Sequence, residues 1–198
     1  MEIVIVSIIA FLTALLTFFS GFGLGTLLAP VLMLFFPIDV AIALTGIVHF
    51  FNNIFKLVLV GKNVNKEVFL RFGIPAIIFA FIGAYVLLQI PNMQPLFSYQ
   101  LIGKTFSVYP LKLTIGSLIL CFAMMDVLRY FNQLQFDKNK LPIGGALSGF
   151  FGGLAGTQGA LRSAFLIRAG LSKEAFIGTT VVISSLVDFT RLSVYSTR

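Results

Sequence analysis

Long apolar runs separated by short polar connectors dominate the chain. The connectors GKNVNKE and FNQLQFDKNK interrupt runs that approach the roughly 20 residues needed to cross a bilayer. Lipid offers no partner for unpaired backbone groups, and the runs lack the strict alternation of barrel strands, so they are predicted to be helices. The runs cover residues 3–19, 24–36, 40–60, 68–90, 111–131, 143–171 and 175–195.

Two segments are too long to be single straight spans. Residues 2–36 contain SGFGLG and residues 143–171 contain GFFGGLAGTQG. A continuous helix over residues 2–36 would be about 52 Å long at 1.5 Å per residue, well beyond the ~30 Å hydrocarbon core. Each segment is therefore predicted to break or turn back at its glycines.

The two glycine-rich segments are related to each other. Offsets of about 132 to 134 residues place Gly21 on Gly153 and Thr45 on Thr179. In both halves, the break is followed by a short apolar stretch, a loop and a helix with a polar face. These correspondences indicate an internal repeat.

The second repeat is shorter than the first. Residues 1–131 form the first repeat, with about four helical units, and residues 132–198 form a partial second repeat with about two. Either the protein is a natural short form or the sequence is incomplete. The predicted fold is an all-α polytopic membrane protein of two related repeats with glycine-broken first helices, the second repeat truncated.

Composition and charge agree with a membrane setting. Hydrophobic residues make up 58% of the chain and charged residues 11%, whereas a soluble domain has about a quarter charged residues. The net charge of +7 is scattered rather than gathered in a stripe, which argues against nucleic-acid binding and favours an anionic leaflet or substrate. The single cysteine, Cys121, permits no disulfide, and we expect no metal site and no cofactor.

The distribution of lysine and arginine predicts the orientation. Basic residues in the connectors at 61–67 and 132–142 place these on the cytoplasmic side, and the loops at 37–39 and 91–110 on the outside. The side of the N-terminus depends on the first segment. A broken span would start inside, and a re-entrant hairpin would start outside.

The paired breaks are candidates for a transporter's central site, because such sites lie where glycine-interrupted helices occupy corresponding positions of two repeats. Close helix packing at small residues is the alternative. Arg162 follows the second break. If a half-helix starts near Thr157, its free amides and this guanidinium would form an anion site; otherwise, Arg162 snorkels or pairs with Asp188. Asp188 and Arg191, at i and i+3, are expected to neutralise each other.

Polar residues of the helices that follow the breaks have two interpretations each. His49 is either a proton relay or a hydrogen bond between helices, and with no second histidine it is not expected to bind a metal. Thr45, Thr179 and Gln158 either cap helices or hydrogen-bond a ligand.

The ordered motifs of both halves resemble the sulfite exporter TauE/SafE family. The first half carries SGFGLGTLLAP and KNVN, and the second carries GFFGGLAGTQG followed by Ala175, Gly178 and Thr179. The resemblance implies a multi-pass permease of the cell inner membrane that moves small anions such as sulfite, sulfonates or related organic acids. Family members usually have about eight spans, so this chain lacks the last two.

We therefore expect a permease rather than an enzyme, with a small anion and the lipid bilayer as partners. Proton coupling through His49 and an oligomer are both compatible with the sequence. The alternative is a membrane subunit that binds a partner and transports nothing. The predicted substrate-binding residues are Gly21, Gly23, Gly25, Thr26, Thr45, His49, Asn53, Gly153, Gly156, Thr157, Gln158, Arg162, Thr179 and Ser184.

Overall fold

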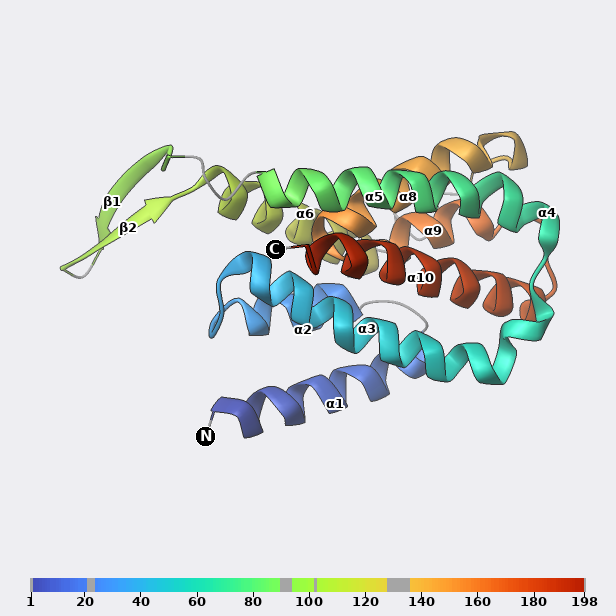
Figure 1. Cartoon of the computed structure of the whole chain (residues 1–198), viewed down its shortest axis with the longest axis horizontal. Helices are drawn as coiled ribbons and strands as arrows, with labels where there is room; N and C mark the ends of the chain where they lie inside the picture. Colours follow the sequence, from blue (N-terminus) through green and yellow to red (C-terminus); the bar gives the residue numbers. More distant parts are fainter. Residues whose placement is uncertain (1, 21–23, 90–93, 102, 128–135, 198) are drawn as a thin grey trace.

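Helices make up most of the computed structural model, which describes residues 2–20, 24–89, 94–101, 103–127 and 136–197 (Figure 1). One two-stranded hairpin projects from the helices. The elements are α1 (Glu2–Ser20), α2 (Leu24–Leu32), α3 (Ile38–Val60), η1 (Gly61–Asn63), α4 (Lys66–Val68), η2 (Phe69–Gly73), α5 (Ile74–Gln89), β1 (Phe97–Leu101), β2 (Lys104–Val108), α6 (Pro110–Val127), η4 (Lys138–Lys140), α8 (Leu141–Ala155), α9 (Gly159–Leu166) and α10 (Lys173–Tyr195).

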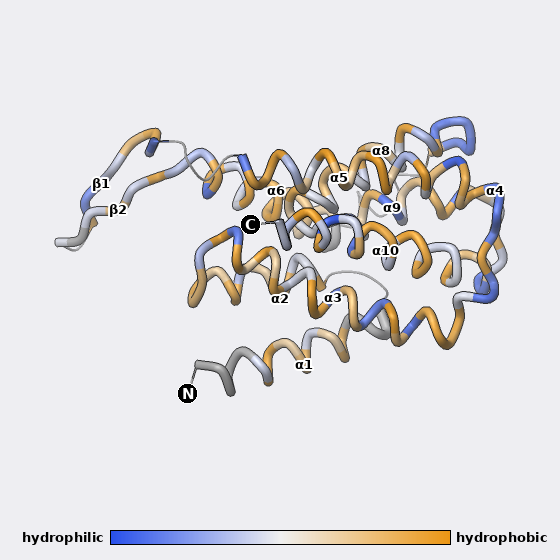
Figure 2. The backbone as a smooth tube through the Cα atoms, in the orientation of Figure 1, coloured by the Kyte–Doolittle hydropathy of each residue, from blue (hydrophilic) through white to orange (hydrophobic). Residues whose placement is uncertain are grey.

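Three continuous helical stretches among the described residues are long and apolar enough to cross a membrane: Ile38–Asn63, Lys66–Gln89 and Lys173–Tyr195. Hydrophobic residues follow the long helices, and hydrophilic residues concentrate at α4 and in other connectors (Figure 2). Many large apolar side chains, such as Phe11, Phe51 and Val58, are exposed. Lipid is the solvent that accommodates such a surface. The predicted all-α membrane fold is confirmed.

The two basic connectors lie at the same end of the molecule. Figure 1 shows the α3–α4 connector at the right, together with the turn around residue 140, whereas the β-hairpin lies at the opposite end. This arrangement agrees with the predicted orientation, in which both basic connectors face the cytoplasm and the 91–110 loop faces outside.

Each glycine-rich segment forms a pair of helices that turns back. In Figure 1, α1 starts at the hairpin end of the molecule and α2 returns to that end, where α3 begins. The pair α8 and α9 starts and finishes at the opposite end, before α10. For the first segment, this is the re-entrant alternative. The opposed directions are those of an inverted-topology repeat, an arrangement that the sequence did not predict, and the internal repeat itself stays a prediction.

Close packing of α5 on α8 fixes the centre of the fold. Gly145, Gly149 and Gly153 of α8 stand directly against the backbone carbonyls of Phe72, Ala76 and Ala80. A Cβ at any of the three glycines would collide with a carbonyl oxygen. These glycines therefore serve helix packing, as small residues commonly do in membranes.

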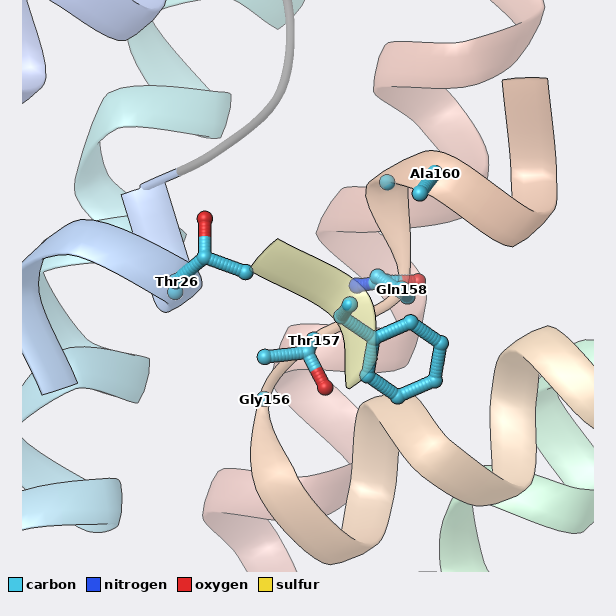
Figure 3. Close-up of a pocket in the computed structure, with 8 residues that line it drawn as sticks. Thr26, Gly156, Thr157, Gln158 and Ala160 are labelled. Carbon is cyan, nitrogen blue, oxygen red and sulfur yellow. The ribbon is translucent and has the colours of Figure 1, made fainter. Parts of the chain in front are cut away.

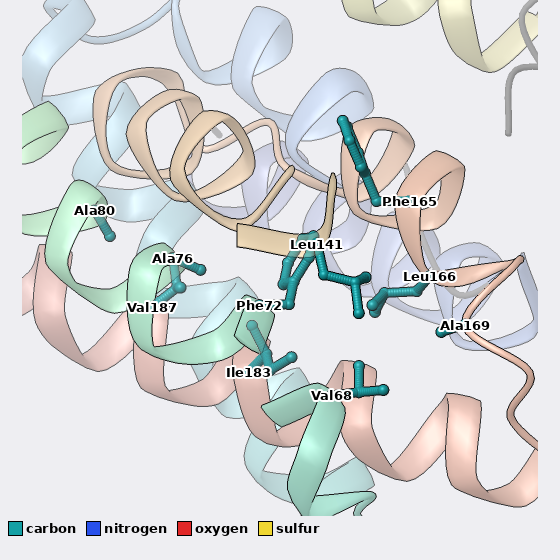
Figure 4. Close-up of a cluster of buried hydrophobic side chains, with 10 residues drawn as sticks. All are labelled: Val68, Phe72, Ala76, Ala80, Leu141, Phe165, Leu166, Ala169, Ile183 and Val187. Atoms are coloured by element: carbon teal, nitrogen blue, oxygen red, sulfur yellow. The ribbon is translucent and has the colours of Figure 1, made fainter. Parts of the chain in front are cut away.

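Apolar side chains from four helical segments complete this centre (Figure 4). Phe72, Ile183 and Val187 are buried where η2 and α10 meet, and Phe165 of α9 stacks on Phe136 at 4.2 Å between ring centroids. This cluster holds α9 and α10 in place beside α8. The full cluster comprises Val68, Phe72, Ala76, Ala80, Leu141, Phe165, Leu166, Ala169, Ile183 and Val187.

The β-hairpin was not expected from the sequence. β1 and β2 pair antiparallel, with Phe97 opposite Val108 and Leu101 opposite Lys104. Gly103 has a φ of 71° in the turn, a left-handed conformation that favours glycine. The alternation in FSYQL is the period-2 pattern of a strand, which the long apolar runs around it obscured.

Candidate functional site

The second helix break is built around Gly156. Helix α8 ends at Ala155, and Gly156 adopts a left-handed conformation with a φ of 74° while its N–H donates to the carbonyl of Gly152. For other residues this conformation costs about 1–2 kcal/mol. Helix α9 then starts at Gly159 without a side-chain cap. The break therefore exposes the first amides of α9, which have no partner within the helix.

The first break meets the second. Gly25, in the first turn of α2, stands against the carbonyl oxygen of Gly156, where a Cβ would collide. Gly21 and Gly23, the other glycines predicted to bind substrate in this segment, lie outside the described residues. The described part of the first break thus contacts the turn of the second break directly.

A small pocket lies where the two breaks meet (Figure 3). Its cavity volume is about 20 Å³, far below the ~300–1,000 Å³ typical of sites for drug-sized ligands. A small ion suits it better than a large metabolite. The lining residues are Gly25, Thr26, Phe122, Gly156, Thr157, Gln158, Gly159 and Ala160.

Three polar side-chain atoms of Thr157 and Gln158, which line this pocket, lack hydrogen-bond partners among the described residues. The hydroxyl of Thr157 and both amide atoms of Gln158 are buried and form no hydrogen bond within the described part of the chain. The carbonyl of Gln158 is held by the hydroxyl of Ser148 at 3.3 Å, and it accepts from the N–H of Arg162 at 3.0 Å. Buried polar groups are normally satisfied, so the unpartnered side-chain atoms point to a missing ligand or water.

Arg162 lies one turn into α9 and is not among the residues that line the pocket. Only 3% of this residue is exposed, and its Nε and Nη1 atoms have no hydrogen-bond partner among the described residues. Asp188 attracts the guanidinium, and Lys56 repels it. Arg162 is therefore buried rather than snorkelling, with a charge that Asp188 alone does not satisfy.

His49 and Asn53 of α3 converge on Asp188 of α10. The Nδ1 atom of His49 lies 2.5 Å from Oδ2 of Asp188, and Nδ2 of Asn53 donates to the same oxygen at 2.7 Å. The Asn53 amide is also 2.9 Å from His49 Nδ1. Asp188 is fully buried, and 13% of the His49 side chain is exposed. The network joins the two helices that follow the breaks.

Arg191 connects this network to the second break. Its Nη2 atom forms an ion pair with Oδ1 of Asp188 at 2.7 Å, without the alignment of a hydrogen bond. Its Nη1 atom donates to the carbonyl of Gly152 at 3.4 Å. A Cβ on Gly156 would lie 2.5 Å from the same Nη1 atom. The guanidinium therefore fills the space directly beside the turn of the break.

The remaining predicted residues lie apart from the pocket. The hydroxyls of Thr45 and Ser184 donate to the carbonyls of Ala41 and Thr180 within their own helices. Thr179 accepts the N–H of Asn65 at 2.8 Å. It thereby ties the α3–α4 connector to the start of α10. These three hydroxyls already have partners in the fold.

Gly153 also lies away from the pocket, in the packing contact between α8 and α5. Its carbonyl accepts a hydrogen bond from the hydroxyl of Tyr195. Helix α8 continues to Ala155, beyond Gly153, before it breaks. The break itself is at Gly156, as the other predicted glycine indicated.

Asp188, Arg191 and Tyr195 were missing from the predicted site. The sequence did contain a signal for them, because ionisable residues within a membrane helix are functional candidates. The spacing of Asp188 and Arg191 suggested mutual neutralisation, and their ion pair is real. What the spacing did not reveal is that both also contact other elements.

Comparison with known proteins gives one match. The family model for the sulfite exporter TauE/SafE matches residues 6–197, nearly the whole chain. No curated protein and no solved structure matches it.

Proposed function

Because the chain belongs to the sulfite exporter TauE/SafE family, we propose that it is a permease that binds a small oxyanion between its two helix breaks. The family is one of membrane transporters for sulfite export, not of enzymes, so the partners of this multi-pass chain are the lipid bilayer and a small anion. We extend the substrate range to sulfonates and related organic acids, and we assign the protein to the cell inner membrane.

The buried guanidinium of Arg162 carries this proposal. Two of its nitrogen atoms are unpartnered within the described chain, only 3% of the residue is exposed, and along α9 it follows the lining residues Gly159 and Ala160. Removing a charge from water without compensation costs several kcal/mol. An anion at the break would supply the missing countercharge.

The surrounding charges favour an anion in the same way. Arg162 and Arg191 are both attracted by a single carboxylate, Asp188. Two guanidinium groups against one carboxylate leave an excess of positive charge in a medium where electrostatic forces are strong. The field at the pocket therefore attracts negative ions.

Direct contacts would come from neutral donors. The Thr157 hydroxyl, the Gln158 amide and the first amides of α9 line or adjoin the pocket, and Thr26 lies across from them (Figure 3). A transported ion has to leave as well as bind, so several neutral donors suit it better than direct contact with a full countercharge. Arg162 then supplies attraction from one turn away.

Flux measurements on the purified full-length chain in proteoliposomes test the proposal. Labelled sulfite and ethanesulfonate are the probes, and Arg162→Gln is compared with Arg168→Gln, a matched change at an exposed position of the same segment. We expect Arg162→Gln to lower the flux by at least about tenfold, the equivalent of ~1.4 kcal/mol in binding. Arg168→Gln should stay close to the wild type.

Two outcomes would contradict the proposal. Equal flux in the Arg162→Gln and wild-type proteins would remove Arg162 from the site. Absence of flux for every small anion from folded wild-type protein would instead favour a membrane subunit that transports nothing.

A further inference from the structure

We propose that the His49–Asp188 pair takes up a proton together with the anion, and that Arg191 transmits this loading to the second helix break. This inference rests on the proposed anion site and adds its coupling ion. The observation behind it is a continuous chain of contacts from His49 through Asp188 and Arg191 to the backbone at Gly152 and Gly156.

The geometry of the pair defines its starting protonation. At 2.5 Å, His49 Nδ1 and Asp188 Oδ2 need a proton between them, since two lone pairs would otherwise repel. With a carboxylate and a neutral imidazole, that proton sits on Nδ1 and the pair carries one negative charge. Asn53 donates to the same oxygen, which leaves Oδ1 of Asp188 to Arg191.

Loading adds one proton to the other ring nitrogen. Nε2 of His49 has a free lone pair in this tautomer, and the side chain is partly exposed. A proton from hydronium forms an N–H bond there, the O–H bond to that proton breaks and water is left, and the charge of the pair changes from minus one to zero. Imidazole is suited to this step because it exchanges protons near neutral pH.

Arg191 is the group that senses this change. In the unloaded state, its Nη2 atom is held by the negative pair, and its Nη1 atom lies beside the break. When the pair becomes neutral, the positive charge of Arg191 is no longer offset. Attraction of an anion to the break therefore increases.

Four other titratable or charged side chains of the described residues lie around the His49–Asp188 pair. Arg191 and Tyr195 face it from α10, Arg162 acts on Asp188 from α9, and Lys56 lies further along α3. Arginine keeps its charge at every pH of interest, so Lys56, Tyr195 and the His49–Asp188 pair are the groups that can exchange protons. The His49→Gln variant separates the pair from the other two.

Linkage requires the coupling to be mutual. If the loaded pair strengthens anion binding, then anion binding strengthens proton binding by the same factor. Proton and anion would then cross the membrane in the same direction. The net direction would follow their combined gradients.

Binding of ethanesulfonate to the full-length protein at about pH 6 and about pH 8 tests the coupling, because the charge of this probe is constant over that range. We expect wild-type affinity to rise as the pH falls, by at most about tenfold per unit for one proton. His49→Gln and Asp188→Asn should lose this dependence. Asp39→Asn, a matched carboxylate change in the first turn of α3, should keep the pH dependence.

A measurement on the unaltered chain avoids any folding defect of the variants. In weakly buffered solution with a pH indicator, addition of ethanesulfonate should cause wild-type protein to take up protons, up to about one per chain. Binding without proton uptake, or pH dependence that survives in His49→Gln, would overturn the coupling and leave the anion site standing. Absence of anion binding at either pH would remove the anion site and the coupling together.

Discussion

At the residue scale, Gly156 is where backbone conformation and buried charge meet. Its left-handed φ ends α8, and the space where a side chain would begin is occupied by the Arg191 guanidinium. The carbonyl oxygen of Gly156 also lies against Gly25 of the first break. The absence of a Cβ at both Gly25 and Gly156 thus allows the two breaks and the Arg191 guanidinium to come into contact.

Gly156→Ala should therefore destabilise the protein more than backbone strain alone would. The left-handed conformation costs about 1–2 kcal/mol for alanine, and displacement of Arg191 adds to this. Gly103→Ala is the matched control, because Gly103 has a φ of 71° but a Cβ there would meet no described atom within 4 Å. Thermal unfolding in detergent should show the larger loss for Gly156→Ala. Equal losses would mean that the Arg191 contact is unimportant.

Single residues of the site were predictable in part. Arg162, His49 and Asn53 could be named because charged and polar groups are rare in membrane helices. The partner of His49 could not be named, since Asp188 is 139 residues away and only the folded chain brings them together. Asn53 rather than its neighbour Asn52 faces Asp188, and only the exact rotation of α3 decides this.

At the element scale, the glycines of the second segment have two separate uses. Gly145, Gly149 and Gly153 recur every four residues and form one face of α8 against α5. Gly156, outside this series, makes the break. The sequence offered packing and breaking as alternatives for the whole segment, whereas the structure assigns each to different glycines. The four-residue spacing of the three packing glycines was the sequence feature that could have separated them from Gly156.

Gly149→Leu should force α5 and α8 apart, because even a Cβ would collide with the carbonyl of Ala76. Overpacking typically costs about 1–3 kcal/mol, and backbone contact leaves little room for relaxation. We expect loss of the monodisperse peak in size-exclusion chromatography. Gly116→Leu, in α6 with nothing near its Cβ position among the described residues, should behave as wild type. A monodisperse Gly149→Leu protein would contradict the packing role.

Thr179→Val should loosen the connector between α3 and α4. The change removes the acceptor of the Asn65 N–H, and an unsatisfied buried donor costs about 1–3 kcal/mol. Faster hydrogen exchange at the Asn65 amide is the expected result. Thr180→Val is the control, because the Thr180 hydroxyl has no partner among the described residues. Unchanged exchange in Thr179→Val would leave this hydroxyl available for a ligand instead.

At the scale of the whole molecule, two pairs of helices enter from opposite ends and meet at their breaks (Figure 1). That each segment breaks or turns back was predictable, because 35 residues of helix do not fit within a bilayer, but the sequence did not decide between the two. The sequence predicted that the two breaks form one site, but not the contact between Gly25 and Gly156. No local sequence pattern specifies how distant segments pack. The hairpin at 97–108 was missed for the converse reason: its local pattern was short and lay between long apolar runs.

Localisation of a heavy-atom analogue tests the central claim most directly. Selenite, the selenium counterpart of sulfite, gives an anomalous diffraction signal in crystals of the full-length protein. We predict a selenium peak in the pocket between Thr26 and Thr157–Gln158, absent from Arg162→Gln crystals and present in Arg168→Gln crystals. Selenite bound in solution but located elsewhere in the crystal, with this pocket empty, would contradict the account.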